Sequence, residues 1–411
     1  MSKTTDLRPV FKHVLLSIAM LVSLGLVSCG GGNGEYRLSV INAEAQFTPI
    51  LMRVLSSLIA VQGSDERFHL VYELELKNPL SGNAVLEQIK VYDPDTDQVL
   101  ATLDSTAIAT RFQIGGINRT GLTTLLGPAQ FGVLYLHLQF DTRESVPLTL
   151  AHQVTAAIDL DNLPPGSEIS AGGMAAVRFE PVTVLGAPFK GENFIAADGC
   201  CESIRHIRAL LPINGGLWLA QRFAIDWEQL DEQNRVFVGD PQDPRSYHIY
   251  GKDLLAVADA TVVVAVDEFA DQVPGAIPTG VAVSEADGNH IILDLGNGGY
   301  VLYAHLEPGS VAVAVGETVQ KGQVIGRVGN SGNTSEPHLH LHVMDAPSAL
   351  VADGLPYVFE NYEITGINLA GTADFDNAAA TGEPATITTV DPPTSHRNQL
   401  PMDLTVVRWP E

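Results

Sequence analysis

Three histidines alternate with leucine near the C-terminal end of the chain, at His338, His340 and His342. Strict alternation is typical of a β-strand, and because successive side chains on a strand point to opposite faces, we expect the three imidazoles on one face. Neutral imidazole is a common zinc ligand, and a ring beside a bound ion can move protons. A fourth histidine, His305, lies in another strand-like run upstream. This spacing predicts a metal site with acid–base groups rather than a solvated polar strand face.

The elements that position these histidines belong to a chain of β-rich composition. Its 411 residues leave room for two ordinary domains, and 45% hydrophobic residues are normal for a globular protein. The 38 glycines and 24 prolines indicate many turns, as in all-β architecture. A formal net charge of −25 argues against nucleic acid as a partner and disfavours a broad electrostatic contact with anionic lipid.

The N-terminus has the pattern of an export signal, with basic residues followed by an apolar run over residues 14–27. This run is short for a membrane span and resembles a bacterial lipoprotein signal, which would cover residues 1–28. The resemblance implies that Cys29 is the lipidated first residue of the exported chain, and residues 29–34 then form a glycine-rich tether. Because no aspartate follows Cys29, we expect a lipid anchor in the outer membrane, facing the periplasm.

The exported part is expected to contain two β-rich domains. Residues 35–185 show short strands separated by turn signals, which predicts an Ig-like β-sandwich. Glycine and proline mark residues 186–199 as a linker. A second domain is expected over residues 200–367, followed by an extended tail over residues 368–411 in which residues 404–407 can form a final strand. The strand-like runs of the first domain are 68–76, 85–91, 98–103, 132–140 and 175–184.

Two further cysteines, Cys200 and Cys201, are adjacent in sequence. They can form a vicinal disulfide, remain buried thiols or bind metal, and of these a structural role is favoured. The histidines of the first domain, His69, His137 and His152, are isolated in sequence and are expected to be structural.

Several motifs follow one another in a specific order between residues 206 and 345. An apolar strand over residues 255–262 precedes a Tyr-x-His motif that ends at His305. A turn-containing segment over residues 315–326 precedes the His-x-His motif at 338–340. This order resembles the M23 family of zinc metallopeptidases, the lysostaphin-like peptidoglycan endopeptidases. The resemblance implies a lysostaphin-like β-sheet domain, known as a duplicated hybrid motif. Biotinyl and lipoyl carriers share the turn-containing segment but not the histidine pattern.

The resemblance also implies roles for individual residues. His340 corresponds to a zinc ligand, and His305 with His338 to the two catalytic histidines. The family's early His-x-x-x-Asp motif matches Arg222-Phe-Ala-Ile-Asp226, so Asp226 is expected to be a second ligand. Arginine cannot bind zinc because it stays charged and has no lone pair to offer.

A third ligand must therefore come from elsewhere, since catalytic zinc sites generally have three protein ligands and an open position. The candidates are His206, His248 and His342, and His206 is preferred because a strand entering beside residues 222–226 would place it at the vacant corner. His342 shares the strand face of His340, but it is less favoured because side chains two positions apart on a strand are roughly 6 to 7 Å from each other.

The implied activity is that of a Zn²⁺-dependent endopeptidase acting on the stem or cross-link peptides of bacterial peptidoglycan. An alternative is a catalytically inactive adaptor that activates other cell-wall hydrolases, which the arginine at position 222 favours. A third alternative is a lipoprotein scaffold whose histidines only scavenge zinc.

Overall fold

The computed structural model of the protein describes residues 46–115, 122–160 and 166–410. The predicted signal peptide, the lipidation site at Cys29 and the glycine-rich tether lie outside the described residues. The described residues from Thr48 onwards belong to one unit of packed elements. Within the described part of the chain, no helix is both long enough and apolar enough to cross a membrane.

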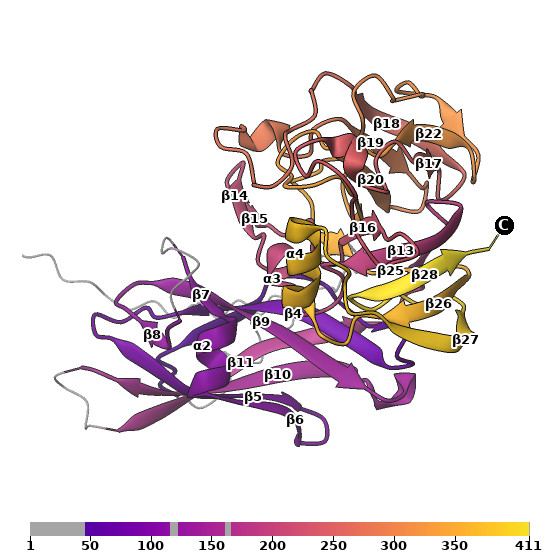
Figure 1. Cartoon of the computed structure of the whole chain (residues 1–411). Helices are drawn as coiled ribbons and strands as arrows, with labels where there is room; N and C mark the ends of the chain where they lie inside the picture. The colour runs from indigo at the N-terminus through magenta and orange to yellow at the C-terminus, as the bar shows by residue number, and fades with distance from the viewer. Residues whose placement is uncertain (1–45, 116–121, 161–165, 411) are drawn as a thin grey trace, which may run out of the picture. The chain divides into compact units, whose positions relative to one another are not determined.

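The first domain is a sandwich of two mainly antiparallel sheets (Figure 1). Among the described residues, one sheet contains β1 (Leu51–Val54), β3 (Val61–Gln62), β4 (Phe68–Lys77), β7 (Phe112–Ile114) and β9 (Phe131–Phe140). The other contains β2 (Leu58–Ile59), β5 (Ala84–Asp93), β6 (Gln98–Asp104), β8 (Leu125–Leu126), β10 (Thr149–Ile158) and β11 (Ser167–Arg178). A helix, α2 (Ser105–Arg111), follows β6, and the Asp104 carboxylate caps it by accepting a hydrogen bond from the Ala107 amide. Apolar side chains from both sheets form the core between them.

Strand β4 is buried on both of its faces. Leu70, Tyr72 and Leu74 pack in the core of the sandwich. Because side chains alternate along a strand, the residues between them point the other way. Among these, Val71 packs in the core of the second domain, and Glu73 is 1% exposed. The outer face of β4 is therefore covered by the second domain.

Four of the five strands predicted for the first domain are confirmed by β4, β5, β6 and β9. The fifth predicted run, 175–184, is interrupted. Strand β11 ends at Arg178, and β12 (Thr183–Leu185) pairs with β25 (Tyr357–Phe359) instead. Pro181 lies between β11 and β12, and proline cannot donate a hydrogen bond to a strand ladder. Apart from this interrupted strand, the structure confirms the predicted all-β fold class.

The second domain is built on one large sheet. Its path through the described residues runs β21 (Thr318–Val319), β18 (Ala260–Val266), β19 (His290–Asp294), β20 (Tyr300–Ala304), β23 (Leu339–Met344), β16 (Ile225–Gln229), β13 (Gly191–Ala197), β28 (Thr405–Trp409), β26 (Tyr362–Ile367) and β27 (Thr388–His396), with β24 (Gly354–Leu355) beside β23. Two short pairs accompany it, β14 (Leu211–Ile213) with β15 (Gly216–Trp218) and β17 (Asp253–Leu255) with β22 (Val324–Arg327). The helical elements of the later chain are α3 (Ile204–Ile207), α4 (Thr372–Thr381), η2 (Pro244–Ser246) and η3 (Val283–Glu285), while η1 (Arg143–Ser145) belongs to the sandwich.

The predicted histidine strand is confirmed as β23, which lies between β20 and β16 and is buried along its whole length. Leu339, Leu341 and Val343 pack in the core of the second domain. Since side chains alternate on a strand, His340 and His342 share the opposite face. The leucines thus hold the strand in the core while the histidines are presented on the other side of the sheet.

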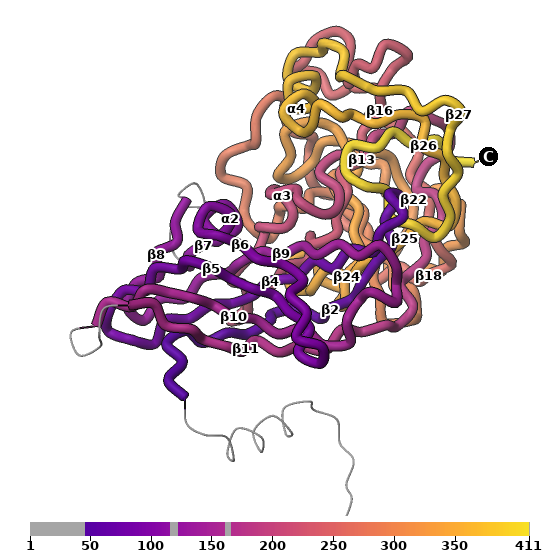
Figure 2. The backbone as a smooth tube through the Cα atoms, turned by 90° about the horizontal axis from the view of Figure 1, so that it is seen from below, coloured from indigo at the N-terminus to yellow at the C-terminus, as the bar shows by residue number. Residues whose placement is uncertain are grey.

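Strand β13 lies in the segment predicted to be a linker. It pairs with β16 on one side and β28 on the other, and β26 and β27 lie beyond β28 in the same sheet (Figure 2). Phe194 and Ile195 of β13 are fully buried. Glycine and proline at the ends of this segment indicate turns correctly, but apolar residues between them form an internal strand.

The segment predicted as an extended tail contains α4, β27 and β28. Strand β28 confirms the expected final strand, and it ends at Trp409, which is 2% exposed. The ring of Trp409 lies 5.3 Å from that of Trp227 and 5.0 Å from that of Phe359. Burial of a large aromatic side chain stabilises this docking despite the polar composition of the tail. The predicted domain limits themselves stay a prediction.

Candidate metal centre

Three adjacent strands bring the predicted site residues together. His340 on β23 lies opposite Asp226 on β16 and opposite Ala304 on β20. His305 follows Ala304 directly, and its φ of 65° places it in the left-handed region. This conformation is uncommon for a residue with a side chain and costs free energy. His338 immediately precedes β23, so the sheet register alone gathers these groups.

His206 reaches the same place from an earlier part of the chain. It lies in the short helix α3 and is 4% exposed. Its Nδ1–H donates to the carbonyl oxygen of Asp198 at 2.7 Å, and its Nε2 lies 3.2 Å from Oδ2 of Asp226. Because one ring nitrogen is held by the backbone, the other faces the carboxylate. The structure therefore brings the preferred candidate for the third ligand to Asp226.

His305 and His338 are oriented in the same manner. Nδ1 of His305 lies 2.8 Å from the carbonyl oxygen of Ser331, and Nδ1 of His338 lies 2.8 Å from that of Glu336. Each Nδ1 must donate its proton, since a carbonyl only accepts. In a neutral ring, Nε2 then keeps its lone pair. The two ring centroids are 4.8 Å apart, and Nε2 of His338 lies 3.5 Å from Oδ1 of Asp226.

His340 contacts both neighbours on its face of the sheet. Its Nδ1 lies 2.7 Å from Oδ1 of Asp226, and its Nε2 lies 2.9 Å from Nδ1 of His342. His342 therefore orients His340 through the ring nitrogen that faces away from Asp226. The remaining candidate, His248, has its Nε2 3.6 Å from Oδ2 of Asp231 and joins no group of possible metal ligands among the described residues.

Two overlapping sets of side chains can hold a metal ion. One set is His206, Asp226 and His340, and the other is His305, His338 and His340. In each set the ligand atoms lie within 4.8 Å of one another. The first set offers two imidazole nitrogens and one carboxylate oxygen, a donor combination that zinc accepts at catalytic sites. Its two histidines also have their outer nitrogens hydrogen-bonded, as is usual for metal-binding histidines.

Arg222 occupies the position where the resemblance implies a histidine ligand, but its guanidinium takes part in other contacts. Its Nε and one terminal nitrogen lie 2.9 and 2.8 Å from the two carboxylate oxygens of Glu73 on β4. The other terminal nitrogen donates to the Gly354 carbonyl at 2.7 Å. Arg222 and Glu73 are both buried. Arg222 thus links the second domain to the sandwich, while the imidazole of His206 lies beside Asp226.

The pKa values of the site residues depend on the negative charge of Asp226. Burial disfavours its charged form, but the adjoining His206, His338 and His340 outweigh this effect and hold the pKa of Asp226 well below its usual value. Burial also opposes a charged His206, yet the Asp226 carboxylate raises the pKa of that ring to about 9. Burial lowers the pKa of His305 and of His340. The carboxylate is therefore the fixed negative charge to which a cation would bind.

A pocket of about 440 Å³ opens onto these groups and is lined by His206, Asp226, His305, His338 and His340. The backbone carbonyls of Asp198, Ser331 and Glu336 that orient the rings had no signal in the sequence, because every residue carries the same carbonyl group.

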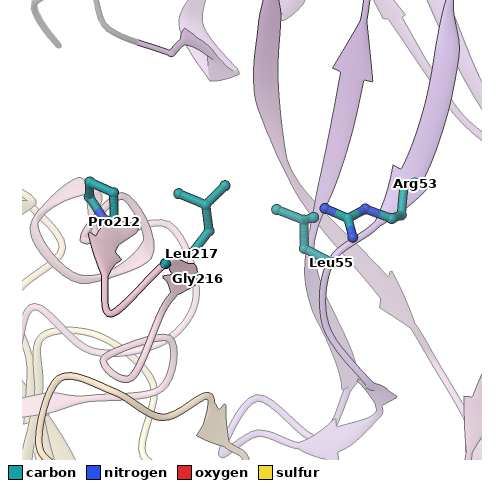
Figure 3. Close-up of a pocket in the computed structure, with 6 residues that line it drawn as sticks. Arg53, Leu55, Pro212, Gly216 and Leu217 are labelled. Atoms are coloured by element: carbon teal, nitrogen blue, oxygen red, sulfur yellow. The ribbon is translucent and has the colours of Figure 1, made fainter.

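A larger pocket, of about 590 Å³, lies elsewhere and is shown in Figure 3. Arg53 and Leu55 line one side of it, and Pro212, Gly216 and Leu217 line the other. It offers a single guanidinium and no imidazole or carboxylate side chain. The smaller histidine-lined pocket therefore offers metal ligands and acid–base groups that this larger pocket lacks.

Comparison with known families identifies the class of protein. Residues 248–351 match the family model described as Peptidase family M23. This range includes His305, His338 and His340 and begins after Asp226. The second domain thus contains a segment that matches peptidase family M23. No curated protein matches the chain.

Three peptidases or peptidase domains are among the solved structures to which parts of the chain are similar. The catalytic domain of the antimicrobial peptidase lysostaphin from Staphylococcus simulans is 22% identical, covering 40% of this chain and 88% of that chain with a TM-score of 0.23. A variant catalytic domain of the prophage-encoded M23 protein EnpA from Enterococcus faecalis is 15% identical, covering 42% and 91% with a TM-score of 0.22. A zinc containing peptidase from Vibrio cholerae is 12% identical, covering 73% and 83% with a TM-score of 0.21.

Proposed function

We propose that this protein is a zinc-dependent endopeptidase that cleaves peptide bonds in the stem or cross-link peptides of bacterial peptidoglycan. The observation that carries the proposal is the common orientation of four histidine rings. His206, His305, His338 and His340 each have one ring nitrogen hydrogen-bonded on the outside. The other nitrogen lies within 3.5 Å of Asp226 in His206, His338 and His340, and His305 groups with His338 and His340. A solvated or purely structural histidine cluster has no reason to align its rings in this way.

His206, Asp226 and His340 would hold the ion, and zinc bound there would supply Lewis acidity that lowers the pKa of water and polarises a peptide carbonyl. His305 and His338 then act as the acid–base pair. With Nδ1 held on a carbonyl, the Nε2 of either ring can accept a proton from water and return it to the leaving amine. The ring that carries the proton also stabilises negative charge on the tetrahedral oxygen.

The location of this activity also forms part of the proposal. A lipid on Cys29 would anchor the exported chain to the outer membrane, facing the periplasm, where peptidoglycan lies. The composition supports a partner other than nucleic acid, since the chain carries 48 acidic and 23 basic side chains.

Incubation of purified peptidoglycan with the full-length, zinc-loaded protein in detergent tests the proposal. Mass spectrometry of the soluble products should show new peptide termini, and His338→Ala should release them at least about 100-fold more slowly while still binding zinc. Intact peptidoglycan after incubation with folded, zinc-loaded protein would contradict the endopeptidase function.

A second candidate function is that of a non-catalytic adaptor for another cell-wall hydrolase. The observation that favours it is Arg222, which replaces an expected ligand and whose polar atoms are engaged by Glu73 and Gly354. An adaptor would stimulate a peptidoglycan amidase equally well with and without zinc. The endopeptidase would digest peptidoglycan alone and only with the metal.

A further inference from the structure

A second cluster of metal-binding side chains lies away from the peptidase centre. His69 on β4 and His137 on β9 come from neighbouring strands of the sandwich, and Cys201 comes from the second domain. Their ligand atoms lie within 4.8 Å of one another. His69 is fully buried and Cys201 is 4% exposed. Two imidazoles and one sulfur therefore converge on a protected point.

The outer nitrogen of each imidazole is bound to a carboxylate. Nε2 of His69 lies 2.8 Å from Oδ1 of Asp65, and Nδ1 of His137 lies 3.0 Å from Oε1 of Glu202. A carboxylate accepts, so each of these nitrogens carries the proton of its ring. Carboxylate–histidine pairs of this kind orient the ligands of many metal sites and increase their basicity.

The inner nitrogens face each other. Nδ1 of His69 lies 2.9 Å from Nε2 of His137. If both rings are neutral and both outer nitrogens are protonated, two lone pairs point at the same small space. Such an arrangement requires a cation between or beside them, either an additional proton on one ring or a metal ion. The adjacent sulfur distinguishes these two possibilities, because a thiolate is a metal ligand of choice.

Cys201 is joined to Cys200 by a disulfide, which removes its thiolate. A dithiol reductant would break the S–S bond by thiol–disulfide exchange. It would deliver two electrons and two protons, leave two thiols on the protein and itself become a disulfide. Metal binding would then release the Cys201 proton to solvent.

We propose that His69, His137 and the reduced Cys201 form a second, redox-gated metal site that takes a borderline or thiophilic ion such as Zn²⁺. The site would connect β4 and β9 of the sandwich to the segment that leads to His206. It is independent of the peptidase centre and of the proposed function, since it shares no ligand with His206, Asp226 or His340.

Two single substitutions test the site as a matched pair, since both abolish the same disulfide. Cys200→Ser leaves Cys201 as a free thiol, whereas Cys201→Ser removes the proposed ligand. Each full-length variant is titrated with Co²⁺ alone, whose thiolate complexes give a charge-transfer absorption band. The peptidase centre contains no sulfur ligand, so this band reports only on the second site.

We expect Cys200→Ser to bind a second equivalent of Co²⁺ with the charge-transfer band and Cys201→Ser to show neither. Adding His137→Gln to Cys200→Ser should weaken this binding at least about tenfold. The wild-type protein should gain the band only after treatment with a dithiol and anaerobic removal of the reductant. Identical titrations of Cys200→Ser and Cys201→Ser, or no band in reduced wild-type protein, would overturn the proposal and leave the two imidazoles sharing a proton.

Discussion

Nε2 of His206 lies 3.2 Å from Oδ2 of Asp226, although the two residues belong to different elements. His206 is on a four-residue helix, and Asp226 is on a central strand of the peptidase sheet. Both lie before the range that matches the family model. An imidazole from outside the matched range thus contacts Asp226, whereas Arg222 contacts Glu73 instead.

Replacing His206 by alanine should abolish stable zinc binding. The loss of a direct ligand should weaken zinc affinity by more than about 100-fold, since losing only an outer partner of a ligand costs about 10–100-fold. Metal analysis after dialysis against a weak chelator measures the effect. His248→Ala is the matched control and should keep its zinc, because His248 contacts Asp231 rather than Asp226. Zinc loss in His248→Ala with retention in His206→Ala would reverse the assignment.

Replacing His342 by leucine should weaken zinc binding without removing a ligand. His342 holds the outer nitrogen of His340 at 2.9 Å, and its removal frees that ring to rotate. We expect a roughly 10–100-fold loss of affinity. Competition with a chromogenic chelator measures it, and His342→Gln should recover part of the affinity because its amide oxygen can accept from His340. Unchanged affinity in His342→Leu would show that His340 is held by its other contacts.

Alanine at His305 or at His338 should reduce turnover but leave zinc in place. Each ring contributes proton transfer, so kcat should fall by about 10²–10⁴-fold for each. The measurement combines zinc content with peptidoglycan digestion for the same preparation. If either variant digests peptidoglycan as fast as wild type, that ring has no part in proton transfer.

The buried ion pair between Arg222 and Glu73 should stabilise the contact between the two domains. Glu73→Gln removes the main counter-charge of a buried guanidinium and leaves only Asp353, at 3.4 Å, so the free energy of unfolding should fall by up to about 3–5 kcal/mol. Arg222→Met should cost a similar amount. The double variant Glu73→Leu/Arg222→Met should lose much less than the sum, because it buries no unpaired charge. Urea denaturation tests this, and additive losses would contradict a coupled pair.

The sandwich should lose stability in mild acid through His152. Its Nδ1 donates to the Gly173 carbonyl at 2.9 Å, and its Nε2 accepts from the Tyr72 hydroxyl at 2.8 Å. Burial lowers the pKa of His152 to about 4, compared with about 6.5 in an unfolded chain. Between these values the unfolded state binds a proton that the folded state does not. The free energy of unfolding should therefore fall by about 3 kcal/mol from pH 6.5 to pH 4 on this account.

His152→Gln is the control for this prediction, since glutamine can donate to the carbonyl and accept from the hydroxyl without titrating. Urea denaturation at several pH values should give a flatter dependence for the variant than for the wild type. Equal slopes for the two proteins between pH 6.5 and 4 would contradict a role for His152.

Local patterns predicted those features that depend on neighbours in sequence. The alternation in β4 and β23 predicted the strands, and the leucines of β23 indicated which face is buried. The order of the motifs around His305 and the His-x-His pair predicted the peptidase fold. In each case, the signal lies within a few residues, where side-chain alternation and turn residues dictate the structure.

Features that depend on distant contacts could not be predicted in the same way. Arg222 pairs with Glu73, which lies 149 residues earlier in the sequence and in the other domain. No local sequence pattern connects the two residues. His69 and His137 are isolated along the chain and become neighbours only because β4 pairs with β9. Strand β28 is short and follows a polar segment, but burial of Trp409 docks it in the sheet.

The most direct test of the metal centre is an anomalous diffraction measurement at the zinc absorption edge, on crystals of the zinc-loaded protein. We expect a strong peak in contact with Nε2 of His206, a carboxylate oxygen of Asp226 and Nδ1 of His340. A peak at His340 without His206, or no peak among these three residues, would contradict this assignment.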